Sequence, residues 1–493
     1  MSSRAAPRLL ISAAHKSSGK TTVSVGLCAA LTERGHVVQP FKKGPDYIDP
    51  LWLGAACHRD CRNLDFHTMP PRLIRETFER VSRGADLSLI EGNKGLFDGV
   101  DLEGANSSAM LANWLEAPVV LVVDCAGMTR GIAPLLLGYQ AFDQSLRIAG
   151  VILNKVSGPR HEKKLRDVVA HYTRIPVLGA VHRGPDMEIM ERHLGLVPAN
   201  EADAAAEAIA RLARAVASQV DLDAIVDLAR QAPPVEMADS PLPAVPAATL
   251  RIGIARDPAF GFYYPDDIEA LRQAGAEPVP FDTLRDSHLP PDLDGLFIGG
   301  GFPETHMAEL EANASLRAEI RARGQAGMPI YAECGGLMYL SRAIVWRGER
   351  REMVGLVPGD AVMYRAPQGR GYVRLRETAD FPWPRLEDGP GVMPAHEFHH
   401  SRLENIEGEP RFAYQVIRGA GIAEKQDGII VGNTLATYAH MRSVGANPWA
   451  PRFVAFVREV KGANWRADNK DAIAASNDYV RRNGVPLVDK RQF

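Results

Sequence analysis

The stretch AAHKSSGKTT, residues 13–22, carries side chains suited to phosphate chemistry. It follows an apolar run, residues 8–14, and leads into an amphipathic stretch typical of a helix. In such a strand–loop–helix unit, backbone N–H groups at the helix N-terminus face the phosphates, Lys20 neutralises them and the Thr21 hydroxyl reaches Mg²⁺. We therefore predict a phosphate-binding loop. A polar turn that caps the helix is the alternative, because Ala14 stands where the first glycine of such a loop is usual.

The predicted nucleotide site takes in the closing part of this loop and nearby acids. We expect ATP to contact Ser17, Ser18, Gly19, Lys20, Thr21 and Thr22. Mg²⁺ on a triphosphate takes one or two carboxylates besides the loop hydroxyl. Acids at the carboxyl ends of parallel strands face the ligand crevice, which favours Thr21, Asp46 and Glu91 as metal ligands. Asp49 and Asp98 are explained equally well as site residues and as solvated loop acids.

A second chemistry is indicated by PIYAECGGLMYL, residues 329–340. An apolar run, a cysteine, two glycines and a helical stretch follow one another, which is the arrangement of a nucleophile elbow. The helix dipole stabilises a thiolate at this position, so Cys334 is suited to nucleophilic attack. Burial as a structural residue is the commoner fate of a cysteine, but the turn favours catalysis. We expect the backbone amides of Gly300, Gly301 and Gly335 to receive the oxyanion.

A nucleophilic cysteine needs a base, and the candidates are His396, His399, His400 and His440. His440 ends an apolar run of β type, where a lone histidine is more often packed than catalytic. Nothing in the local sequence decides among the four. A third, acidic member of a Cys–His–acid triad is not visible, because Met, Arg and Ser follow His440.

The elements that must position these residues alternate between apolar runs and helical stretches. In the first half of the chain the runs are residues 8–14, 36–41, 87–92, 118–124 and 149–155. Strands this apolar are buried on both faces, which is typical of a parallel sheet covered by helices. The rhythm resumes at residues 250–257, 295–301 and 328–336. We therefore predict an α/β fold with two open, mostly parallel α/β domains.

Composition places the boundary between these domains at residues 231–249, where five prolines and little periodicity are typical of a semi-rigid linker. We expect a nucleotide-binding domain over residues 1–230 and a second domain over residues 250–461. Residues 462–493 are polar, lack a core-forming pattern and are expected to form a C-terminal tail.

The overall composition is that of a globular enzyme. Of the 493 residues, 46% are hydrophobic and 24% charged, and the net charge of −3 gives no reason to expect nucleic acid as a partner. Five cysteines, an odd and small number, fit a reducing compartment, so we expect a cytoplasmic protein. No apolar stretch approaches the ~20 residues of a membrane helix, so no membrane partner is expected.

Together these motifs resemble those of the cobyrinic acid a,c-diamide synthase family, from about residue 8 to about residue 460. In chain order they are SSGKTT, KKGPDYIDP, EGNKGLFDG, HLGLVPA, GGGFPE, AECGGLMYL, HEFHHS and ATYAH. In that family an ATP-dependent amide ligase of dethiobiotin-synthetase type is fused to a class I-like glutamine amidotransferase. The resemblance implies glutamine hydrolysis at Cys334, with His440 as base, and delivery of ammonia to the ATP site.

The resemblance also implies a substrate. ATP would phosphorylate the a and c acetate carboxylates of a modified tetrapyrrole, and ammonia would displace the phosphate. Tyr47, Asp49 and Asp98 are the residues it implies for contact with this substrate. EGNKGLFDG and AHMRSVG also resemble the sirohaem-amidating branch of the family found with dissimilatory sulfite reductase, so a sirohaem-type macrocycle is the alternative. The expected partners are small molecules (tetrapyrrole, glutamine and ATP), and the oligomeric state is open, with a homodimer among the options.

Two readings of other classes stay open. A P-loop partitioning or maturation ATPase would need only the first half of the chain, and a tetrapyrrole carrier would not consume ATP. The chain also departs from the family pattern at Ala14 and His15, at Asn93 and Lys94, and in its polar tail. Lys94 is explained equally well as a partner of a substrate carboxylate and as a surface residue.

Overall fold

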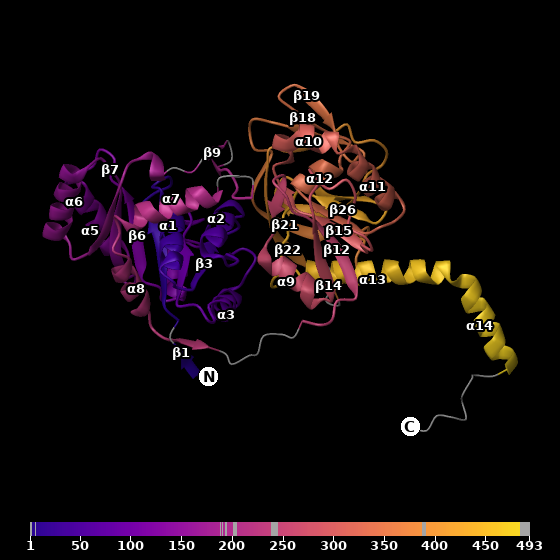
Figure 1. Cartoon of the computed structure of the whole chain (residues 1–493), viewed down its shortest axis with the longest axis horizontal. Helices are drawn as coiled ribbons and strands as arrows, with labels where there is room; N and C mark the ends of the chain where they lie inside the picture. Colours follow the sequence, from indigo (N-terminus) through magenta and orange to yellow (C-terminus); the bar gives the residue numbers. More distant parts are fainter. Residues whose placement is uncertain are drawn as a thin grey trace.

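The computed structural model describes residues 2–4, 6–187, 189, 191–192, 195–200, 205–237, 245–386 and 391–483. Residues 238–244 of the expected linker, residues 193–194 of the HLGLVPA motif and residues 484–493 of the expected tail lie outside the described residues. Two α/β units lie side by side, one built from each half of the chain (Figure 1).

The first unit is a seven-stranded sheet in which every neighbouring pair is parallel. Its strand order is β4 (Arg62–Leu64), β3 (Val38–Lys43), β5 (Leu87–Glu91), β2 (Arg8–Ala13), β6 (Val119–Asp124), β7 (Ile148–Val156) and β8 (Val177–His182). The five apolar runs predicted in this half are strands of this sheet. Their side chains alternate between two cores, so Leu9 and Ile11 face one layer of helices and Leu10 faces the other.

Helices cover both faces of this sheet. One layer holds α1 (Lys20–Glu33), α2 (Ile48–Cys57), α7 (Ala205–Ala217) and α8 (Leu222–Arg230). The other holds α3 (Pro71–Val81), α4 (Ser108–Trp114), α5 (Ile132–Phe142) and α6 (Pro159–Tyr172). A short 3-10 helix η1 (Pro185–Met187) and the small strands β9 (Glu191–Arg192) and β10 (Gly195–Leu196) follow β8. Because both faces are covered, the carboxyl ends of the strands are where a ligand can be reached.

The second unit is a nine-stranded mixed sheet. Its order is β14 (Ala276–Phe281), β12 (Leu250–Ala255), β15 (Gly295–Ile298), β17 (Ile330–Glu333), β26 (Thr434–Thr437), β25 (Gln426–Val431), β24 (Arg411–Arg418), β21 (Gly369–Glu377) and β22 (Val392–His399). The pairs from β14 to β26 are parallel, and those from β26 to β22 are antiparallel. The prediction of two open α/β domains is confirmed. The antiparallel part was not foreseen, because strands such as β21 alternate buried and exposed residues and show no continuous apolar run.

The remaining elements flank this second sheet. One face carries α9 (Pro265–Gln273) and α13 (Trp449–Asp468), and the other carries η2 (Pro303–His306), α10 (Met307–Ala312), α11 (Ala314–Gln325) and α12 (Gly335–Leu340). A small sheet joins β19 (Glu349–Glu352), β18 (Ala343–Trp346), β20 (Asp360–Met363) and β23 (Ser401–Glu404), and β13 (Phe260–Phe262) pairs with β16 (Gly300–Gly301). No helix of the described residues has the length and apolar character needed to cross a membrane.

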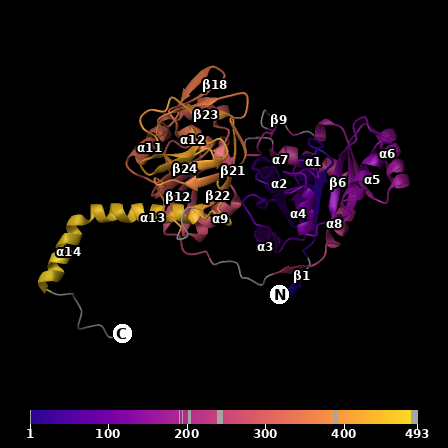
Figure 2. The ribbon, with the colours of Figure 1, turned by 180° about the vertical axis from the view of Figure 1, so that it is seen from behind.

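The expected linker and tail both contain regular structure. Strand β11 (Val235–Met237), within the expected linker, pairs antiparallel with β1 (Ser2–Arg4). Helix α13 continues through the expected boundary at residue 461 to Asp468, and α14 (Lys470–Asn483) follows it. Figure 2 shows both helices extending away from the body of the second unit. The buried side chains of α13 lie in its first half, from Trp449 to Val457.

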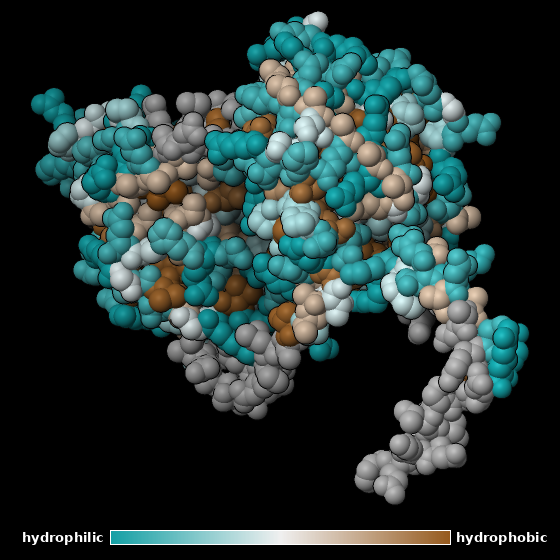
Figure 3. Space-filling view, turned by 45° about the vertical axis from the view of Figure 1, so that its right-hand side comes forward, coloured by the Kyte–Doolittle hydropathy of each residue, from teal (hydrophilic) through white to brown (hydrophobic). Residues whose placement is uncertain are grey.

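The two units contact each other through buried and half-buried ion pairs. Arg442, 2% exposed, donates from Nη2 to the Asn63 carbonyl oxygen and to Asp266 Oδ2, both at 2.7 Å. Arg62 of β4 lies 3.0 Å from both Asp266 and Glu269 of α9. In Figure 3, hydrophilic residues cover most of the visible face and hydrophobic residues appear mainly in recesses. The relative position of the halves is therefore held by specific polar contacts as well as by packing.

Candidate active sites

The loop between β2 and α1 has the backbone that a phosphate site requires. Gly19 precedes α1 with φ 78°, a left-handed conformation that favours glycine. A Cβ there would lie 2.2 Å from Asn154 Nδ2, which donates to the Ser18 carbonyl oxygen at 2.8 Å. Lys155 likewise donates to the Ser17 carbonyl oxygen at 2.9 Å. The end of β7 thus holds the loop on one side, and the other side of the loop faces the pocket.

Ala14 does not strain this loop. Of the described non-glycine residues with positive φ, the loop contributes Ser17, at 66°, and not Ala14. The Ala14 carbonyl oxygen accepts a hydrogen bond from the Tyr139 hydroxyl at 2.5 Å. The left-handed positions therefore fall on Ser17 and Gly19, and a methyl group at residue 14 is compatible with the fold.

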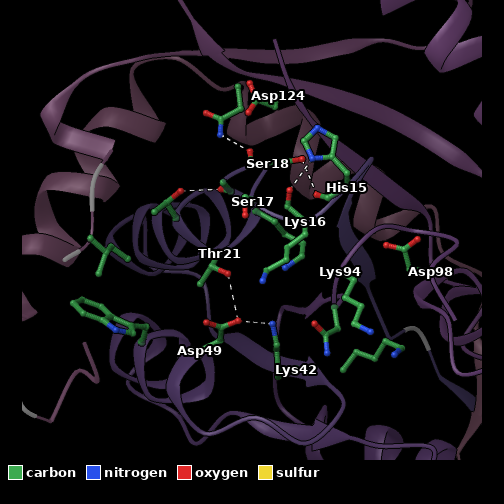
Figure 4. Close-up of a pocket in the computed structure, with 18 of the residues that line it drawn as sticks. His15, Lys16, Ser17, Ser18, Thr21, Lys42, Asp49, Lys94, Asp98 and Asp124 are labelled. Carbon is green, nitrogen blue, oxygen red and sulfur yellow. Dashed lines mark hydrogen bonds and ion pairs between the residues drawn. The ribbon is translucent and has the colours of Figure 1, made fainter. Parts of the chain in front are cut away.

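A buried charge cluster lies directly below the loop. Glu91 Oε1, at the end of β5, accepts from Lys20 Nζ and the Thr21 hydroxyl at 2.8 Å each, and from Lys42 Nζ at 2.9 Å. Burial alone would raise the pKa of Glu91, but the two lysines outweigh it and hold the pKa at about 2. Lys42 also lies 2.5 Å from Asp49 Oδ2, and Figure 4 shows this contact. Glu91 is therefore ionised at neutral pH, and its carboxylate accepts hydrogen bonds from both the loop and β3.

Asp46 belongs to the same cluster. Its carboxylate lies 3.8 Å from Lys42 Nζ and accepts from the Asp49 backbone N–H at 3.1 Å. Burial and the neighbouring Asp49 raise the pKa of Asp46 to about 7, against the opposing effect of Lys42. The structure thus brings Thr21, Asp46, Asp49 and Glu91 together. It adds Lys42, which sequence reasoning missed although two lysines open the KKGPDYIDP motif.

The oxygen atoms of this cluster fit Mg²⁺. Glu91 Oε2 is buried and has no hydrogen-bond partner, so one hard anionic oxygen is left unused. The described residues contain no group of three His, Cys, Asp or Glu side chains arranged to hold a metal alone. Mg²⁺ commonly keeps water and phosphate oxygens as ligands and takes one or two carboxylates from the protein. Two acids and a hydroxyl are therefore enough protein ligands for it.

A pocket of about 2150 Å³ opens over the loop and is lined by both halves of the chain. Its first-half lining includes residues 15–22, Asp49, Lys94 and Asp98, and its second-half lining is residues 370–372 and 396–398. Figure 4 shows Lys94 and Asp98 on the side of the pocket away from Asp124. Ligand pockets are commonly about 300–1,000 Å³, so this one has room for a nucleotide and a second large ligand.

Tyr47 lies elsewhere. It is 9% exposed, is not part of the pocket lining, and packs among rings of the second half. Its ring stacks on Phe262 at 5.2 Å and lies 5.1 Å from the ring of His440. The substrate contact implied for Tyr47 stays a prediction, and in this arrangement the residue joins the two halves.

Cys334 occupies the turn between β17 and α12. Its backbone has φ 47° and ψ −99°, an uncommon conformation for a residue with a side chain. Its N–H donates to the Thr437 carbonyl oxygen at 2.7 Å. Glycines follow because the backbone approaches closely: a Cβ on Gly335 would lie 2.9 Å from the Gly301 nitrogen, and one on Gly336 would lie 2.1 Å from the Ile298 carbonyl oxygen. The predicted elbow is therefore present as geometry.

His440 lies beside this cysteine. Burial alone would lower the pKa of His440. The charge of Cys334, a hydrogen bond to Cys334 and the neighbouring Glu333 outweigh burial and raise this pKa to about 10. Glu333 Oε2 lies 3.6 Å from His440 Nδ1. Glu333 Oε1 accepts from the Tyr331 hydroxyl at 2.6 Å and the Met441 N–H at 2.9 Å, so the carboxylate is fixed in place. Glu333 is the acid that sequence reasoning did not find.

The other three histidines have different surroundings. His396 stacks on His440 at 4.9 Å, and burial and His440 hold its pKa well below the usual range. His399 stacks on Tyr438 at 4.0 Å and lies 3.8 Å from Glu397. His400 Nδ1 lies 3.2 Å from the Tyr364 carbonyl oxygen. The contact with the cysteine sulfur belongs to His440.

The predicted oxyanion-hole glycines converge on the same place. Gly300 and Gly301 form β16, and a Cβ on Gly300 would lie 2.6 Å from His440 Cε1. A Cβ on Gly301 would lie 1.9 Å from the Ala259 carbonyl oxygen. Side chains at these positions would displace the histidine or the neighbouring strand, so the backbone reaches the site only as glycine.

Family models match both halves of the chain. Residues 10–197 match the CobQ/CobB/MinD/ParA nucleotide binding domain, and residues 251–447 match the CobB/CobQ-like glutamine amidotransferase domain. Residues 453–493, partly outside the described residues, match a model of the post-segregation antitoxin CcdA. Among solved structures, the chain is similar to PurLQS from Thermotoga maritima at TM-score 0.34 and 17% identity, over 43% of this chain and 99% of that one.

Two named relatives cover nearly the whole chain. A "Cobyrinate a,c-diamide synthase" of Magnetococcus marinus is 49% identical over 92% of this chain and 97% of its own length. One of Methanosarcina acetivorans is 43% identical over 89% of this chain and 93% of its own length. A nucleotide-binding half joined to a cysteine-dependent amidotransferase half defines an ATP-dependent carbon–nitrogen ligase that takes its nitrogen from glutamine. The chain belongs to the cobyrinate a,c-diamide synthase family of these ligases.

Proposed function

We propose that the chain amidates the a and c acetate carboxylates of a cobyrinic acid-type tetrapyrrole. The observation that carries this proposal is the pocket of about 2150 Å³ shared by both halves, with the Lys20–Glu91–Lys42 cluster below it. That volume suits a macrocycle beside a nucleotide. The names of the relatives, which match over nine-tenths of their own length, support the same substrate.

In the first half, carboxylate activation falls to the loop and the acids below it. ATP supplies the phosphoryl group that turns a carboxylate into a good acceptor for ammonia, and Mg²⁺ bound there would neutralise the phosphates. The N-terminus of α1 and Lys20 would bind the phosphates, while Thr21, Asp46 and Glu91 would hold the metal. Lys42 keeps Glu91 ionised and holds the carboxylates of Glu91 and Asp49 in place.

In the second half, Cys334 attacks the carboxamide carbon of glutamine. The backbone amides of Gly300, Gly301 and Gly335 receive the oxyanion, and His440 protonates the departing nitrogen so that ammonia leaves. The glutamyl group is then held on the Cys334 sulfur as a thioester, and water attacks its carbonyl carbon while His440 takes a proton from that water. The carbon–sulfur bond breaks, glutamate leaves, and His440 returns the proton to the sulfur, which restores the thiol. Glu333 orients His440 and supports its charge through their 3.6 Å contact.

A sirohaem-type macrocycle is the second candidate. It is favoured by Asn93 and Lys94 of the EGNKGLFDG motif, both of which line the shared pocket. The chemistry in the two halves would be the same, and the proposals differ in which macrocycle the pocket holds.

Mass spectrometry of the products tests this proposal. The purified enzyme is incubated with ATP, Mg²⁺, glutamine and either cobyrinic acid or a sirohaem-type macrocycle. Conversion of two carboxylic acids to amides on cobyrinic acid supports the proposal, and amidation of the other macrocycle alone replaces it with the second candidate. Glutamate release and ATP hydrolysis with no amidated macrocycle would overturn both.

A further inference from the structure

Three cations from both halves line the pocket outside the phosphate loop itself. Lys43 ends β3, Lys94 lies in the loop after β5, and Arg370 lies in β21 of the second unit. Lys43 is 4% exposed, whereas Lys94 and Arg370 are exposed. The cations thus approach one space from two domains and at different depths.

Lys43 and Arg370 contact neutral groups. Lys43 Nζ donates to Asn106 Oδ1 at 2.9 Å and lies 5.5 Å from the Phe66 ring. The Arg370 guanidinium lies 5.6 Å from the Phe398 ring. Burial, Lys42 and Lys94 lower the pKa of Lys43 to about 8, against the opposing effect of Asp65. Burial is the largest cause of this lowering, and the positive charges of Lys42 and Lys94 add to it.

Three of the other four lysines around the pocket are paired with carboxylates, whereas Lys16, in the phosphate loop, forms no ion pair among the described residues. Lys20 and Lys42 are paired with Glu91 at 2.8 and 2.9 Å, and Lys155 is paired with Asp124 at 2.7 Å. In the part of the chain that the structure describes, Lys43, Lys94 and Arg370 form no ion pair with a carboxylate. Cations in a partly desolvated pocket attract anionic ligands strongly, and guanidinium groups bind carboxylates in bidentate geometry.

We infer that Lys43, Lys94 and Arg370 bind the ionised carboxylates of the macrocycle that are not being amidated. The inference rests on the proposed function, because only a substrate with several carboxylates offers such groups while another is at the ATP site. It makes the amidotransferase half part of the substrate site through Arg370. It also assigns Lys94 to substrate binding.

The test measures the KM of the macrocycle with ammonium as nitrogen donor, so that the glutaminase site does not limit the rate. We compare Arg370→Ala, Arg370→Lys, Lys43→Met and Lys94→Met with the wild-type enzyme. Loss of one charge-assisted contact is expected to raise this KM roughly tenfold, and Arg370→Lys should recover part of the loss. The KM for ATP should stay within about twofold, because the phosphate loop is untouched.

Arg402→Ala is the matched control. Arg402, in β23, lies 5.6 Å from the Tyr364 ring, as Arg370 does from Phe398, but is not part of the pocket lining. Its removal should leave the KM of the macrocycle unchanged. A second readout is ionic strength: macrocycle binding, followed by equilibrium dialysis without ATP, should depend less on salt in each charge-removing variant than in the wild type.

The outcomes separate this inference from the proposed function. If the wild type amidates no tetrapyrrole, the proposed function fails. If it does and the three charge-removing variants keep the wild-type KM and salt dependence, the inference fails alone. Equal increases in the KM of the macrocycle and of ATP would also overturn it, since they would indicate a general disturbance of the pocket.

Discussion

The two reactive centres share a local plan but differ in the residue just before the helix. Each follows a parallel strand and lies at the N-terminus of a helix, with a positive φ at the residue just before that helix. In the first half this residue is Gly19, at φ 78°; in the second it is Cys334, at φ 47°. Glycine leaves the turn open for a ligand's phosphates, whereas a cysteine there places its sulfur at the tip of the turn.

The surroundings of the two turns differ as strongly. The first opens into a large pocket and is supported by buried lysines and carboxylates. The second is enclosed by glycine backbone and rings, and Cys334 is 7% exposed. The comparison indicates that buried ion pairs support the first centre, whereas close approach of the backbone shapes the second. Four substitutions test this contrast.

The largest effect is expected for Cys334→Ser. Loss of the sulfur nucleophile should lower glutamine-dependent amidation roughly 1000-fold or more, while ammonia-dependent amidation stays near the wild-type rate. The measurement compares amide formation with glutamine and with ammonium chloride. Equal loss with both nitrogen sources in a folded variant would show that the two centres are not separate.

Lys20→Ala should lower amidation roughly 100-fold or more with either nitrogen source, because a charge at the transferred phosphate is lost. Glutamate release without ATP should be retained, since the second centre is unaffected. Phosphate release and glutamate release are followed in parallel. Normal ammonia-dependent turnover would mean that the loop is a polar helix-capping turn.

Glu91→Gln should raise the Mg²⁺ concentration for half-maximal rate roughly 10- to 100-fold, because the amide keeps the size of the carboxylate and removes its charge. Ala14→Gly is the matched control within the same site, with an expected change below about twofold, since residue 14 does not require a positive φ. Initial rates at saturating ATP are measured against Mg²⁺. An unchanged curve for Glu91→Gln would remove Glu91 from the metal site.

The smallest effect is expected for Glu333→Gln, which should lower glutaminase activity roughly tenfold by removing a charged partner of His440. The pKa of His440 is raised to about 10, so its proton is retained above the usual range and lost as pH rises through about 10. Without Glu333 this loss should begin at lower pH, so the alkaline limb of the pH–rate profile should shift to lower pH. A profile identical to that of the wild type would exclude this role.

The sequence predicts the residues of each centre that are contiguous in the chain, and it misses those that strand pairing brings in from elsewhere. The phosphate loop was recognisable because its residues are contiguous and lie between a strand and a helix. Lys42 was missed because its role depends on β3 and β5 lying side by side, where Lys42 is paired with Glu91 across the ladder. The acid beside His440 was sought two residues after it, although Glu333 comes 107 residues earlier in the chain. It reaches the histidine only because β17 pairs with β26.

The fold was predictable to a similar degree. Fully buried parallel strands show as continuous apolar runs, and those runs led directly to the first sheet. Strand β21 alternates buried and exposed side chains, and β22 carries His396 and His399, so neither was recognised as a core strand from the sequence. The sequence alone therefore could not predict that these two strands line part of the pocket.

The contact around Arg442 has a consequence for how such a protein could exist as two chains. The second half presents Asp266 and Glu269 together with Arg442, which leaves an excess of negative charge on that face. The first half presents Arg62 and Arg80 to it. If gene fission separated the halves, their opposite charges would steer the two polypeptides toward each other, and association would slow as salt is added. The covalent connection would then contribute local concentration, while recognition would come from the faces themselves.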